Sequence, residues 1–176
     1  MPCATAPRCS SNRWRTCPLG EILTLEDAKR RREASRILGR RFVFTNGCFD
    51  LIHPGHTELL RRARSLGHYL LVGLNSDRSV RTIKGPDRPV QGEQARATVV
   101  AALASVDYVV LFDEDTPLRL IEALLPDILV KGGDYTPSSV VGKAEVERAG
   151  GHVHVIPLVP GFSSSQIALR IRQGAG

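Results

Sequence analysis

Two histidines on either side of a Pro-Gly step, His53 and His56, are the side chains of this 176-residue chain best suited to chemistry on phosphate. An apolar run at residues 42–45 precedes them and predicts a buried strand. Pro54 suits the first turn of a helix, so a helix N-terminus with unpaired N–H groups should follow. Gly55 lets a phosphate approach the backbone closely, and each imidazole can donate a hydrogen bond to it. The unit predicts a binding site for the phosphates of a nucleotide.

Two lysines and a run of serines extend this set of phosphate-binding groups. Lys84 and Lys131 can neutralise charge on attacking or departing phosphates, and the serines at 163–165 begin a predicted helix that offers a second anion site. Nucleotidyl transfer needs little covalent chemistry from the protein, because an attacking phosphate is already anionic at neutral pH. The protein must align the reactants and stabilise the phosphoryl oxygens. His53, His56, Lys84 and Lys131 are therefore the predicted catalytic residues.

Other catalytic patterns are absent from the sequence. It contains no P-loop, no Gly-x-Ser-x-Gly nucleophile elbow and no Gly-x-Gly-x-x-Gly dinucleotide pattern. Cys48, His53 and His56 could approach a zinc ion, but no clear fourth ligand accompanies them, so no metal site made of side chains is predicted. Cys48 is interpreted as a small turn residue and not as a nucleophile. Mg²⁺ is expected to arrive with ATP, held partly by the phosphates.

The elements that position these groups alternate between apolar strands and amphipathic helices. Strands are expected at 42–45, 68–74, 108–112, 127–130 and 152–158, and helices at 24–38, 54–66, 93–104, 116–124, 140–149 and 166–173. Residues 78–92 are expected to form a loop. This order predicts an α/β fold, a single Rossmann-like domain whose five-stranded parallel sheet carries helices on both faces. The candidate groups then fall beyond the carboxyl ends of the strands, where such sheets bind ligands.

Positive charge is concentrated near the N-terminus. The net charge is +6, and residues 1–41 hold 10 of the 24 Lys/Arg but only 4 of the 18 Asp/Glu. The remaining residues hold 14 of each sign, so no basic groove for nucleic acid is expected on the body of the domain. No apolar run is long enough to span a membrane, and none follows the basic N-terminus as in a secretory signal. A cytoplasmic protein is expected.

Residues 1–20 are interpreted as a disordered leader, and residues 21–176 as the domain with its first helix packed on it. Cys3, Cys9 and Cys17 lie in this leader and form no Cys-x-x-Cys pair, so neither a zinc site nor a disulfide is predicted there. Binding of nucleic acid by the basic leader is a separate hypothesis. Unchanged activity and unchanged affinity for nucleic acid after removal of residues 1–20 would exclude it.

The segment from Gly47 to His56 resembles the signature of the cytidylyltransferase-like nucleotidyltransferases, which carry a His-x-Gly-His element. From about residue 22 to residue 172 the chain further resembles the heptose 1-phosphate adenylyltransferases of that superfamily. The stretches that carry this second resemblance are 44–50, 75–77, 84–90, 107–110, 112–117 and 129–135. It implies transfer of AMP from ATP to D-glycero-β-D-manno-heptose 1-phosphate, with release of pyrophosphate. The product, ADP-D-glycero-β-D-manno-heptose, would enter the lipopolysaccharide inner core, and relatives imply a homodimer.

The resemblance also implies which residues contact the substrates. Nucleotide contacts are expected at Thr45, Asn46, Gly47, Cys48, Phe49, Gly55, Arg96, Gly161, Phe162, Ser163, Ser164 and Ser165. The sequence does not show which residues contact the heptose; the candidate substrate contacts are Asp50, Asn75, Asp77 and Asp134, of which Asp50 and Asp134 are candidates for sugar or metal contact. Glycerol-phosphate cytidylyltransferases carry an arginine before the terminal motif, whereas this chain has Leu158-Val159-Pro160-Gly161, which disfavours transfer of CMP. A cytidylyltransferase acting on a polyol or other sugar phosphate is the alternative function. A regulatory nucleotide-binding module without turnover is a second alternative.

Overall fold

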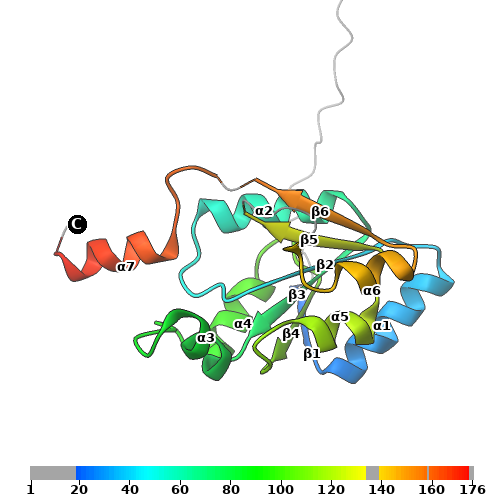
Figure 1. The fold of residues 1–176 in the computed structure, drawn as a ribbon, viewed down its shortest axis with the longest axis horizontal. Helices are drawn as coiled ribbons and strands as arrows, with labels where there is room; N and C mark the ends of the chain where they lie inside the picture. The colour runs from blue at the N-terminus through cyan, green and yellow to red at the C-terminus, as the bar shows by residue number, and fades with distance from the viewer. Residues whose placement is uncertain (1–18, 134–138, 158, 175–176) are drawn as a thin grey trace, which may run out of the picture.

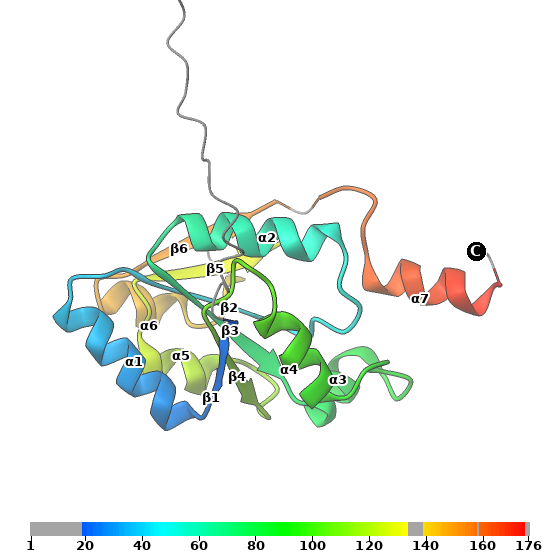
Figure 2. The same cartoon turned by 180° about the vertical axis from the view of Figure 1, so that it is seen from behind.

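A six-stranded parallel sheet forms the centre of the computed structural model, which describes residues 19–133, 139–157 and 159–174 (Figures 1 and 2). The strand order is β1-β4-β3-β2-β5-β6, with β1 at Glu21–Leu23, β2 at Phe42–Gly47, β3 at Tyr69–Asn75, β4 at Tyr108–Phe112, β5 at Ile128–Gly132 and β6 at His152–Ile156. The helices are α1 at Leu25–Ile37, α2 at Pro54–Ser65, α3 at Asp77–Lys84, α4 at Glu93–Ala101, α5 at Leu118–Leu124, α6 at Lys143–Arg148 and α7 at Ser164–Arg172. The predicted α/β class is confirmed.

Each face of the sheet carries its own hydrophobic core, and Figures 1 and 2 show the two helical layers from opposite sides. On one face, α2 and α4 contribute buried side chains such as Leu60 and Val100. On the other face, α1, α5 and α6 contribute Ala28, Ile121 and Val146. The central strands β2 and β3 are buried along most of their length, as their continuous apolar runs predict for strands covered on both faces.

The sheet has six strands, one more than the five expected, because β1 pairs in parallel with β4 at the edge. Three residues are too few to show an alternating pattern, so the local sequence does not mark Glu21–Leu23 as a strand. Gly20, which was expected to end a disordered leader, is packed into the domain. Its N–H donates to the carbonyl of Ala101 (2.8 Å), and a Cβ on it would lie 2.7 Å from the carbonyl oxygen of Val106. The leader cysteines lie outside the described residues.

A further helix, α3, occupies part of the segment 78–92 that was expected to be a loop. Ser76 caps it, since its Oγ accepts a hydrogen bond from the backbone N–H of Ser79 at 3.1 Å. Its only apolar residues are Val80, which is buried, and Ile83, which is exposed, so the apolar pattern covers too few residues to mark a helix in the sequence. The loop is therefore shorter than expected and joins α3 to α4 through residues 85–92.

The last helix, α7, stands away from the layered part of the domain on the segment that follows β6 (Figures 1 and 2). It begins at Ser164, two residues earlier than expected, because Ser163 is the N-cap and accepts a hydrogen bond from the backbone N–H of Ser165 at 3.2 Å. Leu169 and Ile171 of this helix are exposed. Across the described parts of the chain, the helices are too short or too polar to cross a membrane.

Candidate active site

The strand order reverses at β2, since β3 and β4 follow on one side while β5 and β6 lie on the other. β2 pairs in parallel with both β3 and β5. In open parallel sheets such a reversal leaves a crevice beyond the carboxyl ends of the strands. The signature turn, defined here as residues 48–53, leads from the end of β2 into α2 at this crevice. The fold therefore places the signature at the position where α/β sheets bind ligands.

The two signature histidines stack on one another at the start of α2. Their ring centroids are 3.8 Å apart, with an angle of 20° between the rings. The ring of Phe49 lies 5.1 Å from that of His56, and the ring of Phe162 lies 6.4 Å from that of His53. The Nδ1 atoms of both histidines are buried and have no hydrogen-bond partner within the described ranges. Since buried polar atoms are nearly always paired, these nitrogens at a helix N-terminus indicate a place for a polar ligand.

Burial keeps both imidazoles neutral. It is the largest influence lowering the pKa of His56, to about 4; the neighbouring His53 and Lys84 lower that pKa further, and an interaction of the ring with the backbone of Leu51, the smallest of these influences, raises it. The pKa of His53 is lowered as well, first by burial and then by the charge of Lys84. A neutral imidazole donates a single N–H, so each ring offers one hydrogen bond to a phosphate oxygen but no positive charge. Positive charge beside the two rings therefore has to come from other residues, and Lys84 is one whose charge reaches both of them.

The low pKa of His56 predicts that the ligand-free protein loses stability in mild acid. In the unfolded chain this group titrates near its ordinary value of about 6.5, whereas in the folded protein it stays neutral down to about 4. Between these values the unfolded state binds more protons, so the free energy of unfolding falls as the pH drops. Urea unfolding measured from neutral pH down to about 4.5 tests this. A His56→Asn variant should show a flatter dependence, and identical pH profiles would contradict the prediction.

The two predicted lysines lie on different elements of this edge of the sheet. Nζ of Lys131, on β5, donates to Oδ1 of Asn46 at 2.9 Å and so joins the carboxyl ends of β5 and β2, while burial lowers its pKa. Lys84, at the end of α3, is exposed and lines a hollow of about 200 Å³ together with Ser165 of α7. The charge of Lys84 reaches both histidines, whose pKa it lowers. The structure thus brings all four predicted catalytic residues to one edge of the sheet.

The remaining signature residues shape the backbone around the histidines. Oγ1 of Thr45 is buried and, like the two ring nitrogens, lacks a partner among the residues described. A Cβ atom on Gly47 would lie 3.1 Å from the ring of Phe49, and a Cβ atom on Gly55 would lie 3.0 Å from the ring of His53. Larger residues at these two positions would therefore displace the rings. Phe49 adopts a φ of 44°, a conformation that few residues other than glycine take. Burial raises the pKa of Cys48, which agrees with a turn residue and not with a nucleophile.

Asp50 has a structural role in the ligand-free protein, and the sugar contact expected for it stays a prediction. Its carboxylate is fully buried and accepts hydrogen bonds from Nη1 of Arg88 (2.6 Å) and from the backbone N–H groups of Val90 (2.8 Å) and Gln91 (3.1 Å). These bonds hold the loop after α3 against the signature turn. The partners lie 38 to 41 positions away along the chain, so local sequence could not show that the carboxylate is already occupied.

Arg96 also has a structural role in the ligand-free protein, and the nucleotide contact expected for it stays a prediction. Its fully buried side chain donates to the carbonyl oxygens of Cys48 (2.6 Å), Asn75 (2.9 Å) and Gln91 (2.9 Å) and to Oδ1 of Asp77 (2.7 Å). The guanidinium therefore ties the signature turn to the end of β3 and to the first turn of α3. It positions the loops that form the site.

The other candidate sugar contacts have separate outcomes. Asn75 is buried and donates from Nδ2 to Oγ of Ser79 at 2.9 Å, so its amide supports α3, and the expected sugar contact stays a prediction. Asp134 lies outside the described residues. Asp77 retains partial exposure, at 27% of its side chain, and stays available to a ligand.

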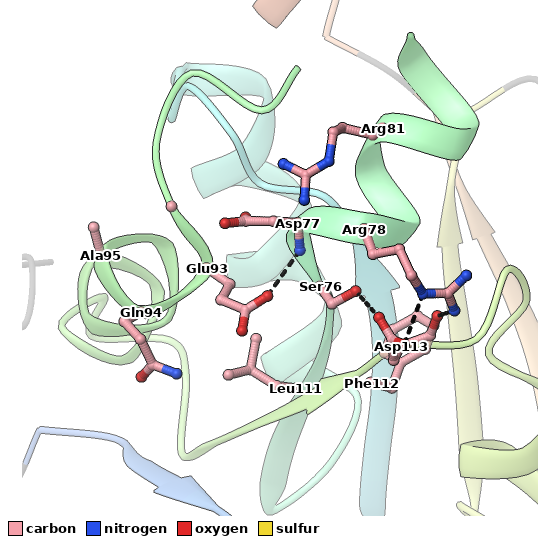
Figure 3. Close-up of a pocket in the computed structure, with 11 residues that line it drawn as sticks. Ser76, Asp77, Arg78, Arg81, Glu93, Gln94, Ala95, Leu111, Phe112 and Asp113 are labelled. Atoms are coloured by element: carbon pink, nitrogen blue, oxygen red, sulfur yellow. Dashed lines mark hydrogen bonds and ion pairs between the residues drawn. The ribbon is translucent and has the colours of Figure 1, made fainter. Parts of the chain in front are cut away.

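Asp77 lines a pocket of about 610 Å³ beyond the carboxyl ends of β3 and β4 (Figure 3). In this view Arg81 extends over Asp77, and Glu93 accepts a hydrogen bond from the backbone N–H of Asp77 at 2.8 Å. Asp113 lies across the pocket, where it pairs with Arg78. The four predicted catalytic residues are not among the residues that line it, so this pocket is separate from the stacked histidines.

The terminal motif faces the signature across a second hollow of about 240 Å³. Residues 52–54 form one wall, and Gly161, Phe162 and Ser163 form the other together with the start of α7. The ring of Phe162 lies nearly parallel to that of His53, at an interplanar angle of 16°. Residues predicted to bind the nucleotide from opposite ends of the chain thus meet at the stacked histidines.

Three polar side chains of this region were not singled out from the sequence. Gln166 and Arg170 line the hollow beside His53, and their spacing of four places them on one face of α7. That spacing, directly after the serines that begin the helix, is the sequence signal that could have identified both side chains. Arg88 lines the neighbouring hollow with Lys84, and nothing local distinguishes it from the other basic residues of its loop.

A protein-family model described as cytidylyltransferase-like matches residues 44–168 of the chain. A bifunctional protein HldE from Geotalea uraniireducens (strain Rf4) is 57% identical over 143 residues, which cover 81% of this chain and 29% of that protein. A bifunctional protein HldE from Syntrophotalea carbinolica is 60% identical over 139 residues, covering 79% of this chain and 28% of that protein. The chain therefore spans less than a third of the length of these curated relatives.

Solved structures share the arrangement of the sheet and helices. The lipopolysaccharide core biosynthesis protein from Thermoplasma volcanium GSS1 aligns with a TM-score of 0.57 at 24% identity, covering 69% of this chain and 98% of that chain. The pantothenate synthetase from Thermus thermophilus aligns with a TM-score of 0.59 at 17% identity, covering 88% of this chain and 70% of that chain. At these identities the likeness shows the fold alone.

Proposed function

This chain belongs to the cytidylyltransferase-like family, and we propose that it is an adenylyltransferase acting on D-glycero-β-D-manno-heptose 1-phosphate. It transfers AMP from ATP to the sugar phosphate and yields ADP-D-glycero-β-D-manno-heptose for the lipopolysaccharide inner core. The observation that carries the proposal is the stacked pair His53 and His56, whose unpaired Nδ1 atoms lie at the N-terminus of α2. Identity of 57–60% to proteins named HldE supports the sugar assignment made from the longer sequence stretches.

The reaction is a displacement at the α-phosphorus of ATP. A phosphate oxygen of the sugar phosphate forms the new P–O bond, and the bond from the α-phosphorus to the β-bridging oxygen breaks. The electron pair of that bond leaves with pyrophosphate, and the anionic attacking oxygen needs no general base. His53 and His56 donate hydrogen bonds to the phosphoryl oxygens, while Lys84 and Lys131 neutralise the charge of the attacking and departing phosphates.

Mg²⁺ is part of the proposal as a companion of ATP. Across the described ranges, no group of three or more His, Cys, Asp or Glu side chains is arranged to hold a metal ion. The buried carboxylate of Asp50 is occupied by Arg88 and two backbone N–H groups. These residues do not fit a dedicated magnesium site, so the ion's ligands are expected to be phosphate oxygens and water.

Pyrophosphate release tests the proposed function directly. The purified protein is incubated with D-glycero-β-D-manno-heptose 1-phosphate and either ATP or CTP, with glycerol phosphate as the competing acceptor. Release with ATP and the heptose phosphate only is the expected result. Release with CTP and glycerol phosphate would favour the cytidylyltransferase alternative, and nucleotide binding without release under any combination would favour a regulatory module.

Replacement of Lys131 by methionine is expected to lower kcat about a hundredfold, a loss typical of removing one group that stabilises transition-state charge. Methionine keeps most of the buried apolar stem but removes the ammonium group that donates to Asn46. Steady-state pyrophosphate release measures the effect. Lys143→Met is the matched control, because Lys143 only pairs with Glu147 on α6 (3.7 Å). Equal kcat in the two variants would remove Lys131 from the catalytic set.

Two further parts of the proposal concern the state of the protein. We propose that the protein forms the homodimer that the resemblance implies. The exposed Leu169 and Ile171 on α7 provide apolar area that a second copy could cover. Sedimentation equilibrium tests it, with a monomer mass at micromolar concentration as the contradicting outcome.

The use of ATP supports a cytoplasmic location, which fractionation of cells would test.

A further inference from the structure

The loop of residues 85–91 connects the signature turn to α7 through a single arginine. Nη1 of Arg88 donates to Oδ2 of Asp50 at 2.6 Å, and Nη2 donates to the carbonyl oxygen of Ser164 at 3.2 Å. The side chain of Arg88 is 11% exposed and that of Asp50 is fully buried. Asp50 belongs to the signature turn, whereas Ser164 is the first residue of α7. One rigid guanidinium fork thus spans the two elements that flank the proposed nucleotide.

The remaining contacts of this loop strengthen the same connection. The carboxylate of Asp50 also accepts the backbone N–H groups of Val90 and Gln91, which pins the loop to the signature turn. At the other end of α7, Arg172 donates to Asp87 at 2.9 Å in an exposed ion pair. Both ends of α7 are therefore tied to one loop, although the helix stands away from the layered body (Figures 1 and 2).

This connection matters because the proposed nucleotide site is assembled from two parts. His53 lies in the first part and Phe162 and Ser163 in the second, with the hollow of about 240 Å³ between them. A ligand that needs both parts binds only to molecules in which the two parts are correctly placed, so its apparent affinity is proportional to the fraction of such molecules. A contact that fixes α7 against the signature raises that fraction.

We infer that Arg88 is a positioning residue that holds the serine run of α7 at the stacked histidines and so prepares the site for ATP. The inference rests on the proposed function, because it takes ATP as the ligand of both parts. Arg88 touches no reacting atom in this account. Its loss is expected to weaken ATP binding and to leave saturated turnover and the affinity for the sugar phosphate comparatively unchanged.

A simpler role for Arg88 is to neutralise the buried charge of Asp50, and two variants separate the roles. In Arg88→Lys the ammonium group can pair with Asp50. The shorter side chain has no planar guanidinium, so it cannot also donate to the carbonyl oxygen of Ser164. The double variant Asp50→Asn with Arg88→Met removes the buried charge together with its partner, while the asparagine oxygen still accepts from the loop backbone. If neutralisation is the whole role, the double variant should bind ATP like the wild type.

The experiment is calorimetric titration of each protein with a non-hydrolysable ATP analogue, followed by kcat and KM for both substrates. We expect at least a tenfold rise in Kd and in KM for ATP in Arg88→Lys and in the double variant, with KM for the heptose phosphate changed less than threefold. Arg172→Met, which removes the exposed second tie, should raise Kd two- to threefold. Arg61→Met is the control, since Arg61 only pairs with Glu58 on the surface of α2, and it should bind as the wild type does.

The outcomes distinguish failure of this inference from failure of the proposed function. A wild-type protein that binds no adenine nucleotide removes the proposed function itself. Wild-type affinity in Arg88→Lys, or in the double variant, overturns the positioning role while the function stands. Equal losses in kcat and in both KM values would indicate general damage and would also count against it. Circular dichroism and thermal unfolding confirm that each variant is folded before it is titrated.

Discussion

Replacement of His56 by alanine is expected to lower kcat for pyrophosphate release by about 10²-fold to 10³-fold, the loss measured when one preorganised donor to a developing oxyanion is removed. His56 lies at the N-terminus of α2, stacked on His53, with a buried Nδ1 that has no hydrogen-bond partner in the described part of the chain. Its depressed pKa keeps the ring neutral, so the variant loses a hydrogen-bond donor and not a cation. The donor is already placed in the ligand-free protein, and for that reason its loss should act on turnover more than on KM.

Two controls make this result interpretable. His154→Ala removes an exposed imidazole from β6 and should leave kcat unchanged. His56→Asn restores a side-chain N–H donor of smaller size and should recover part of the lost rate. Full activity in His56→Ala, with the protein folded, would show that the signature turn is not the catalytic centre.

Replacement of Arg96 by methionine should produce the largest loss of stability, about 3 kcal/mol, as expected when one partner of a buried ion pair is removed. The substitution leaves Oδ1 of Asp77 and the carbonyl oxygens of Cys48, Asn75 and Gln91 without their donor. For a domain of this size such a loss lowers Tm by roughly 6–12 °C. Activity should fall as well, because the signature turn and the start of α3 lose their common anchor.

The measurement also decides between the two roles considered for Arg96. Thermal and urea unfolding give the stability, and ATP titration well below Tm gives the affinity. Arg78→Met is the matched control, because Arg78 forms an exposed ion pair with Asp113 and its loss should change stability by less than about 0.5 kcal/mol. An unchanged Tm with tenfold weaker ATP binding would restore the direct nucleotide contact expected from the sequence.

The elements that build the site could be predicted where the sequence carries strong local signals. β2 and β3 are buried on both faces, so their apolar runs are continuous, and Pro54 marks the start of α2 without ambiguity. β1 is three residues long, and α3 is eight residues long with only two apolar residues, so both elements are too short for their apolar pattern to be recognised. Short elements of this kind form because neighbours from elsewhere in the chain bind them, as β4 does for β1.

The sequence by itself predicted a phosphate-binding site, because His53, His56, Lys84 and Lys131 carry suitable groups and parallel α/β sheets bind ligands beyond the carboxyl ends of their strands. It could not determine which polar side chains face a ligand and which face the protein. Asp50 and Arg96 have the charged side chains and the location typical of binding residues, yet both are buried and hydrogen-bonded to other parts of the protein. Asp50 pairs with Arg88, which is 38 positions away, and Arg96 donates to the carbonyl of Cys48, which is 48 positions away. Only tertiary folding brings these residues together. The tertiary structure therefore showed which candidate side chains are already engaged by the protein, since that depends on long-range hydrogen bonds and not on residue type or spacing.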